Sequence, residues 1–132
     1  MKRTYDTGMD NNSIILEVKI GTVGVAYTAT YLSRTGGQWT KLSESNEENG
    51  NIPESEIGKA SYLRSSYIVI RSIIDFGHLS ENEREIAVNN INASYIFTGG
   101  FSGRQDYNFD NDDLTVTPDK KLVTIIKAIE MI

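Results

Sequence analysis

The sequence predicts a mainly β domain, either an antiparallel β-sandwich or a flattened barrel of about seven to nine short strands. The first observation behind this prediction is that apolar and polar residues alternate in several separate segments, as in half-buried strands. The second is that glycine-rich or polar turns separate those segments. The third is length, because 132 residues correspond to a single domain over residues 1–132 that buries enough surface to form a core.

The first half of the chain contains three strand-like segments. SIILEVKI at residues 13–20 alternates apolar and polar residues, and VAYTATYLSRT from residue 25 does the same. The second segment ends at Gly36-Gly37, a pair that allows the positive φ angles of a tight hairpin. We therefore predict a three-stranded meander over residues 13–42, with Trp39 near the surface.

The middle of the chain combines a polar stretch with an apolar one. Residues 43–56 hold five acidic residues and no basic residue, so like charges repel there and little apolar area is available for packing. This composition predicts a mobile acidic loop. Residues 66–75, SYIVIRSIID, are apolar on both faces of a strand, which is typical of a central strand covered on two sides.

One short helix is predicted over about residues 81–91. Ser80 and Glu83 have the spacing of a capping box, and acidic residues occupy the first turn. Residues 93–98 alternate again, and short strands are expected near Tyr107 and at residues 114–117.

The last segment fits two structures. Pro118 and Asp119 suit a helix start, which would give an α+β fold with a C-terminal helix over residues 118–131. The same residues suit a turn, and Val123, Ile125 and Ile129 then alternate along a strand rich in β-branched residues. The pattern favours the strand.

Composition limits the classes of function. The net charge is −5 and there is no cysteine, so disulfides and thiolate metal sites are excluded. The basic residues are scattered rather than gathered in a stripe, which argues against nucleic-acid binding, and the acidic surface argues against membrane binding. Because neither a signal peptide nor a membrane-spanning apolar run is apparent, we expect a cytoplasmic protein.

A candidate calcium loop lies in DYNFDNDD, residues 106–113. Its oxygen-bearing side chains occupy alternate positions, a spacing that can direct several carboxylates toward one Ca²⁺ ion. Asn111 and Thr117 depart from that pattern, where glycine and glutamate are needed, so a polar turn is the favoured interpretation and calcium the alternative. The candidate ligands are Asp106, Asn108, Asp110 and Asp112.

Reactive side chains form no recognisable catalytic constellation. The single histidine, His78, has Asp75 and Ser80 nearby in the sequence, but the members of a catalytic triad usually come from distant segments. We therefore expect no catalytic residues and a protein that is not an enzyme.

Aromatic residues supply the remaining candidate site. Trp39, Tyr31 and Tyr107 are the candidate ligand-binding residues, because rings on a β surface can stack on sugars or line a cavity. The favoured function is a non-catalytic interaction or assembly subunit that binds a protein partner or its own copies. The alternatives are a carbohydrate-binding β-sandwich, with or without calcium, and a carrier of a small apolar ligand.

Overall fold

The computed structural model describes residues 3–34 and 37–132. The described residues form ten strands in two sheets, one with the strand order β1-β10-β6-β3-β4 and β9 beside β10, the other with the order β5-β2-β7-β8. In chain order the elements are β1 (Thr4–Tyr5), β2 (Ser13–Gly21), β3 (Val25–Ser33), β4 (Trp39–Glu44), β5 (Ile52–Lys59), α1 (Ala60–Leu63), β6 (Ser66–Asp75), α2 (Glu81–Asn89), β7 (Asn92–Thr98), β8 (Gln105–Tyr107), the 3-10 turn η1 (Asn111–Asp113), β9 (Leu114–Val116) and β10 (Leu122–Met131).

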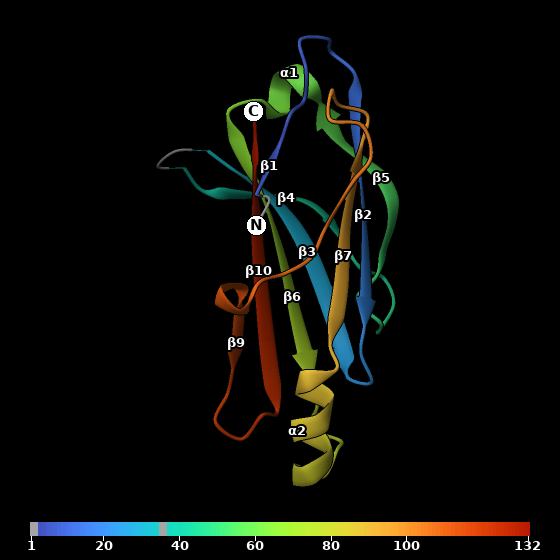
Figure 1. Cartoon of the computed structure of the whole chain (residues 1–132), viewed down its shortest axis with the longest axis vertical. Coiled ribbons are helices and arrows are strands. Elements are labelled where there is room, and N and C mark those ends of the chain that lie inside the picture. Colours follow the sequence, from blue (N-terminus) through green and yellow to red (C-terminus); the bar gives the residue numbers. More distant parts are fainter. Residues whose placement is uncertain (1–2, 35–36) are drawn as a thin grey trace.

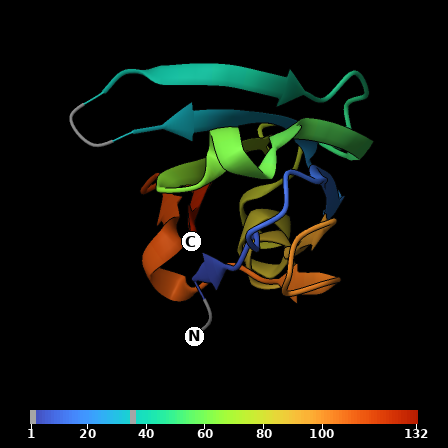
Figure 2. The ribbon, with the colours of Figure 1, turned by 90° about the horizontal axis from the view of Figure 1, so that it is seen from above.

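The two sheets pack face to face with one apolar core between them (Figures 1 and 2). Each sheet contributes alternate residues of its long strands, such as Ile68 and Ile70 from β6 and Leu16 and Val18 from β2. The predicted antiparallel sandwich is therefore confirmed. Over the described residues the sheets do not close into a barrel, and the helices there are too short or too polar to cross a bilayer.

The C-terminal segment is a strand and not a helix. β10 pairs with β6 without a register shift, from Leu122 opposite Asp75 to Met131 opposite Ser66. Val123, Ile125 and Ile129 are fully buried on one side of this strand. A helix over the same residues would give up that continuous pairing, so the apolar alternation with a period of two decides the structure.

Helix α2 forms where the capping residues predict it. The Ser80 hydroxyl accepts a hydrogen bond from the backbone N–H of Glu83 at 3.4 Å, and the Glu83 carboxylate accepts from the backbone N–H of Ser80 at 2.9 Å. This reciprocal cap pairs two backbone donors at the helix start. The helix extends beyond the strands at one end of the sandwich (Figure 1), and it ends two residues before the predicted boundary.

The predicted meander is wrong in one pairing. β3 and β4 form the expected hairpin, with Ser33 opposite Trp39, although Gly36 of its turn lies outside the described residues. β2, however, pairs with β5 and β7 in the other sheet. The connection after β2 crosses between the sheets at Gly24, where an added Cβ would lie 2.6 Å from Ile74 Cγ2.

The acidic loop is shorter than predicted. Residues 43–44 belong to β4 and residues 52–56 to β5, so the connection covers residues 45–51. Ile52 and Ile57 are buried and anchor β5 despite the acidic residues between them. The connection itself is bonded to β3, because the Ser45 N–H donates to the Thr28 carbonyl at 2.8 Å and the Ala26 N–H donates to the Glu48 carbonyl at 2.7 Å.

Candidate functional site

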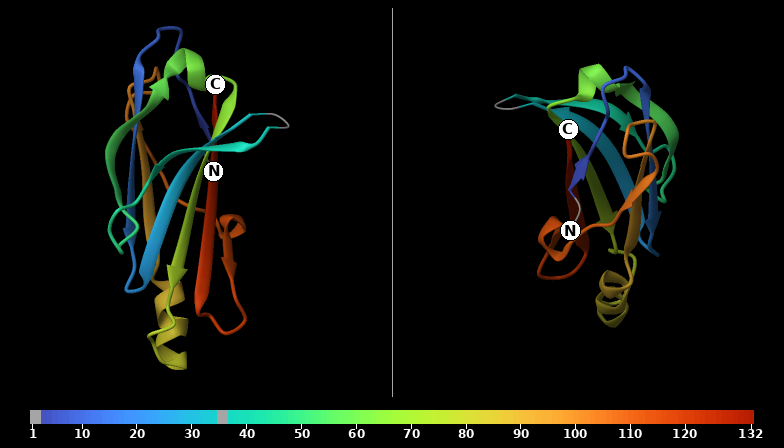
Figure 3. Two further views of the ribbon diagram at one scale, coloured as in Figure 1. Left: turned by 180° about the vertical axis from the view of Figure 1, so that it is seen from behind. Right: turned by 45° about the horizontal axis from the view of Figure 1, so that its top comes forward.

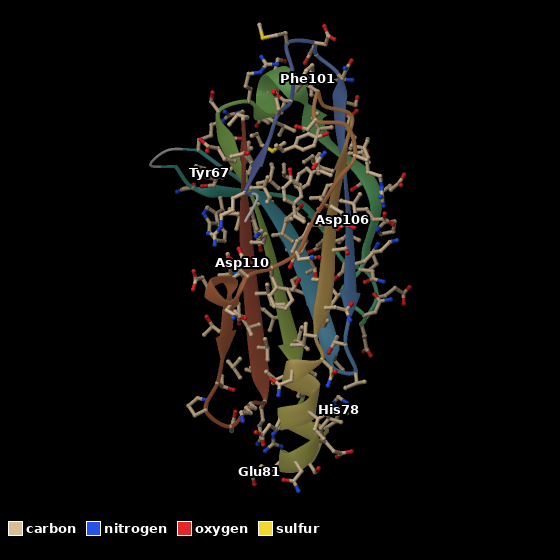
Figure 4. The ribbon with its side chains drawn as sticks, in the orientation of Figure 1. Tyr67, His78, Glu81, Phe101, Asp106 and Asp110 are labelled. Atoms are coloured by element: carbon tan, nitrogen blue, oxygen red, sulfur yellow. The ribbon has the colours of Figure 1, made fainter. Side chains whose placement is uncertain are left out.

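The four candidate calcium ligands do not converge. Asp106, Asn108 and Asp112 are exposed, whereas Asp110 turns toward the protein interior. Figure 4 shows Asp106 and Asp110 on separate parts of the segment. Within residues 3–34 and 37–132 no group of three or more histidine or acidic side chains has a metal-binding arrangement.

Asp110 belongs instead to a buried ion cluster around Lys127. The Lys127 side chain comes from β10, points into the sandwich, and leaves the residue only 1% exposed. Its Nζ lies 3.3 Å from Asp110 Oδ2 and 3.4 Å from Asp113 Oδ2. Arg3 also reaches Asp110 Oδ2, at 3.0 Å. Two carboxylates and two cations thus neutralise one another where a single charge would be costly.

This ion cluster connects three distant segments. Asp110 and Asp113 lie in the segment after β8, Lys127 lies in β10, and Arg3 precedes β1. The Asp110 N–H donates to Asp113 Oδ2 at 2.7 Å, which caps the η1 turn. The acidic segment is therefore tied to β10 by ion pairs. The sequence contains a signal for this site that the predictions above did not use, because Lys127 occupies an inward position within the alternation of β10.

Two polar atoms beside the cluster have no hydrogen-bond partner among the described residues: Asp110 Oδ1 and the Tyr95 hydroxyl. Burial is the main cause, and the Asp113 charge a second cause, of a strongly raised pKa for Tyr95. The Tyr95 phenol therefore keeps its proton to a higher pH than an exposed tyrosine does.

Asp75 and Ser80, the residues near His78 in the sequence, bond to the backbone of the described chain. Asp75 Oδ1 accepts from the Gly77 N–H at 2.7 Å, and the Ser80 hydroxyl caps α2. Among the described residues no hydrogen bond joins His78 to either side chain. Asp75 and Ser80 therefore have local roles in a turn and a helix cap.

The structure brings together two of the three candidate aromatic residues. Tyr31 of β3 and Trp39 of β4 have ring centroids 5.3 Å apart at an interplanar angle of 44°. Tyr107 is separate, only 3% exposed in the core, and its hydroxyl donates to the Thr4 carbonyl at 2.7 Å. Burial raises the pKa of Tyr107 to about 12, as expected for a phenol in the core.

Tyr31 and Trp39 are part of a larger apolar surface on the side of the six-stranded sheet that faces away from the core. Side chains alternate along strands, and here they place one set of residues from β10, β6, β3 and β4 on this side. We call this surface the outer face. Its members are Leu122, Thr124, Ile126, Ala128, Glu130, Tyr67, Val69, Arg71, Ile73, Asp75, Val25, Tyr27, Ala29, Tyr31, Ser33, Trp39, Lys41 and Glu44.

The outer face is exposed and aromatic. Trp39 is 45% exposed and Tyr67 is 44% exposed, and Tyr27, Ile126 and Val25 are also exposed. Figure 3 shows that β3 and β4 extend beyond the other strands of the sheet. The two-faced apolar pattern of residues 66–75 predicted a covered strand, but in the chain itself the outer side of β6 is only partly covered.

Polar side chains on the outer face are held in fixed positions. The Tyr27 hydroxyl donates to Glu44 Oε2 at 2.5 Å, and Lys41 Nζ lies 2.9 Å from the same oxygen. The hydrogen bond from Tyr27, followed by that from Lys41, lowers the pKa of Glu44. The Arg71 guanidinium lies 5.5 Å from the Tyr31 ring centroid and donates to the Tyr31 hydroxyl at 3.1 Å. These contacts limit the loss of side-chain entropy when a partner binds.

No family model matches the sequence, and no curated protein or solved structure is significantly similar to it. Function is therefore inferred from the side chains of this chain. Two features stand out in its geometry, the buried ion cluster and the outer face. Lys127, Asp110 and Asp113 of the cluster are buried, whereas the outer face is open to a macromolecule.

Proposed function

We propose that the protein is a non-catalytic assembly subunit that binds a second copy of itself through the outer face. The observation that supports this proposal is the exposure of Trp39, Tyr67 and Tyr27 beside Arg71 on one side of a sheet. Aromatic residues and arginine are enriched in protein interfaces. A second sheet packed on this face would bury them, as sheets do in sandwiches.

The size of the outer face suits a stable interface. β3, β6 and β10 have nine or ten residues each, and β4 adds a fourth strand. With a rise of about 3.3 Å per residue and a strand spacing of about 4.8 Å, the face measures about 30 Å by 15 to 20 Å. A standard protein interface buries about 800 Å² of accessible surface per partner. The accessible area of the outer face is of this order, because its projecting side chains add to the flat area of the sheet.

The charge distribution favours a second copy as the partner. The chain carries a net charge of −5, which would oppose self-association through most of its surface. On the outer face, however, the cations Lys41 and Arg71 offset most of the charge of three carboxylates, those of Glu44, Asp75 and Glu130. Two copies can therefore approach face to face with little repulsion, while the acidic connection at residues 45–51 stays at the edge.

Sedimentation or light scattering tests this proposal. We expect the wild-type mass to be twice the 14.7 kDa of the chain at micromolar concentration. Tyr67→Arg and Ile126→Arg should each shift the mass to that of the monomer, because they place like charges against each other across the interface. Phe101→Arg is the matched control, since Phe101 is exposed but lies in the loop after β7, in the other sheet.

Two outcomes would contradict the proposal. One is a wild-type protein that stays monomeric up to high micromolar concentration. The other is a dimer that Phe101→Arg disrupts and Tyr67→Arg does not. A monomer that captures a heterologous partner through the outer face would retain the interaction function but exclude self-assembly.

A carbohydrate-binding role is the second candidate, and the neighbouring rings of Tyr31 and Trp39 support it. Their 44° tilt and the Arg71 guanidinium beside Tyr31 favour a protein partner over a flat sugar. Trp39 is the single tryptophan, so its fluorescence reports directly on this surface. If sugars bind here, oligosaccharides will change the Trp39 emission in a saturable manner, and Trp39→Ala will abolish binding measured by calorimetry.

A further inference from the structure

An open groove lies at the end of the sandwich where α2 projects beyond the strands (Figure 1). It has a volume of about 660 Å³ and lies between the β2–β3 turn and one side of α2, from Leu79 just before the helix to Asn90 just after it. This volume falls within the range of about 300 to 1,000 Å³ that is usual for small-molecule sites. The main lining residues are Val23, Leu79, Ile86, Ala87, Asn90 and Asn92.

The walls of the groove are apolar and partly uncovered. Val23 is 69% exposed and Ile86 is 64% exposed, on opposite sides of the groove. Leu79 is half-buried and Ala87 is buried beneath them. Helix α2 buries little of its own surface, so Ile86 has no packing role that explains an isoleucine at this position. A bound apolar molecule would remove both exposed side chains from water.

Gly21 makes room for a polar side chain in the groove. A Cβ at Gly21 would lie 2.3 Å from Asn92 Oδ1 and 2.8 Å from Asn92 Cγ, so any other residue would displace the amide. The Asn92 amide has no hydrogen-bond partner among the described residues. It therefore has donors and an acceptor available to a ligand.

The electrostatic character of the groove is negative. Glu83 is the one charged residue among the described residues that line the groove, and its carboxylate lies there without a basic lining residue. An anionic molecule is thus disfavoured, and a molecule that donates hydrogen bonds is favoured.

We propose that this groove binds a small apolar molecule that donates hydrogen bonds and carries no negative charge, such as an apolar amine. Val23 and Ile86 cover its apolar part, and Asn92 and Glu83 lie where they can accept its hydrogen bonds. This binding site is distinct from the outer face, so the two proposals can fail independently.

Fluorescence titration with two probes tests the site. N-phenyl-1-naphthylamine is an uncharged apolar amine, and 1-anilinonaphthalene-8-sulfonate is an apolar anion of similar size. We expect the amine to bind with a one-to-one stoichiometry and at least tenfold more tightly than the sulfonate. No saturable binding of the amine, or tighter binding of the sulfonate, would overturn the proposal.

Variants then locate the binding. Ile86→Ser should weaken amine binding about tenfold, because it removes an apolar wall. Asn92→Ala and Gly21→Ala should each weaken amine binding about two- to tenfold. The double variant should bind the amine as tightly as the more affected single variant, because both substitutions act through the Asn92 amide. Phe101→Ser is the matched control, since Phe101 is 81% exposed at the opposite end of the molecule from α2 (Figure 4).

The control fixes the interpretation of these variants. Unchanged binding by Phe101→Ser, with loss in Ile86→Ser, supports the groove. Equal affinities for wild type and Ile86→Ser would overturn it. If the Gly21→Ala protein does not show the native circular dichroism spectrum, the Asn92→Ala variant tests the same amide. Asn92 is exposed, so this substitution does not disturb the core.

Discussion

At the scale of single residues, Lys127 is the side chain whose role differs most from what its type suggests. Lysine is rarely buried, yet Lys127 is 1% exposed between two aspartates. Its ammonium group neutralises Asp110 and Asp113, and their carboxylates make its burial tolerable. The cluster therefore fixes where the segment after β8 crosses toward β10.

We predict that Lys127→Met lowers the free energy of unfolding by about 3 to 5 kcal/mol, because it leaves buried carboxylates without their cation. Arg3 still contacts Asp110 in this variant, so the Asp113 carboxylate is the one left without a neighbouring cation. Lys59→Met is the matched control and should cost less than about 1 kcal/mol, since the Lys59–Glu56 pair is exposed and lies in the other sheet, away from the outer face. Urea denaturation at pH 7 measures both. Equal effects would show that burial of the Lys127 pair adds nothing to stability.

We predict that burial of Tyr107 makes the free energy of unfolding fall at alkaline pH. Its pKa is raised from 10.0 to about 12 by burial, so the folded state holds its proton more tightly than the unfolded state does. The contribution of this proton to the free energy of unfolding is complete below pH 10. It is lost as the pH rises toward 12, at about 1.4 kcal/mol per pH unit.

The variant Tyr107→Phe isolates this effect. At pH 7 it should be less stable than wild type by about 1 kcal/mol, because the hydrogen bond to the Thr4 carbonyl is lost. Between pH 10 and 12 the difference should shrink and then reverse, since phenylalanine has no proton to lose. Urea midpoints measured across this range provide the test, and a constant difference would contradict the prediction.

At the scale of elements, the segment at residues 106–113 links the two sheets rather than forming a separate site. It begins in β8 of the four-stranded sheet and ends at η1, beside β9 of the six-stranded sheet. Its alternating oxygens suggested calcium. In the folded chain the strand ends at Tyr107, so the alternation stops there: Asp110 points inward to Lys127, while the residues at 106, 108 and 112 are exposed.

We expect calcium and chelator to leave the thermal midpoint of unfolding unchanged. The reason is that Asp110 already contacts Lys127 and Arg3, so a cation would have to displace both. Differential scanning calorimetry with millimolar calcium, and then with chelator, measures this. A calcium-specific rise of about 6 to 15 °C that Asp112→Ala abolishes would contradict it, and magnesium at equal ionic strength is the control.

At the scale of the whole molecule, the sandwich separates three surfaces with different chemistry. The outer face is apolar and aromatic, the groove beside α2 is apolar with polar acceptors, and the connections carry much of the acidity. A second copy on the outer face would leave the groove at the end of the strands accessible. Assembly and ligand binding are thus compatible in one subunit.

The sequence by itself determined the elements whose signal is local. The period-two alternation of β10 and the Ser80–Glu83 cap of α2 act between residues close along the chain, so their patterns are visible without a fold. Trp39 was also placed at the surface from its position after a hairpin turn.

Tertiary structure alone decided which strands pair and which side chains meet. The crossing of β2 into the second sheet depends on close packing of Gly24 against Ile74, a contact between distant segments. Tyr107 looks like Tyr31 in sequence, but its side chain is buried in the core against Phe97. The Lys127 cluster joins side chains 14 and 17 residues apart, with Arg3 added 107 residues from Asp110. Such pairings depend on burial and distance in the folded chain, which sequence periodicity does not encode.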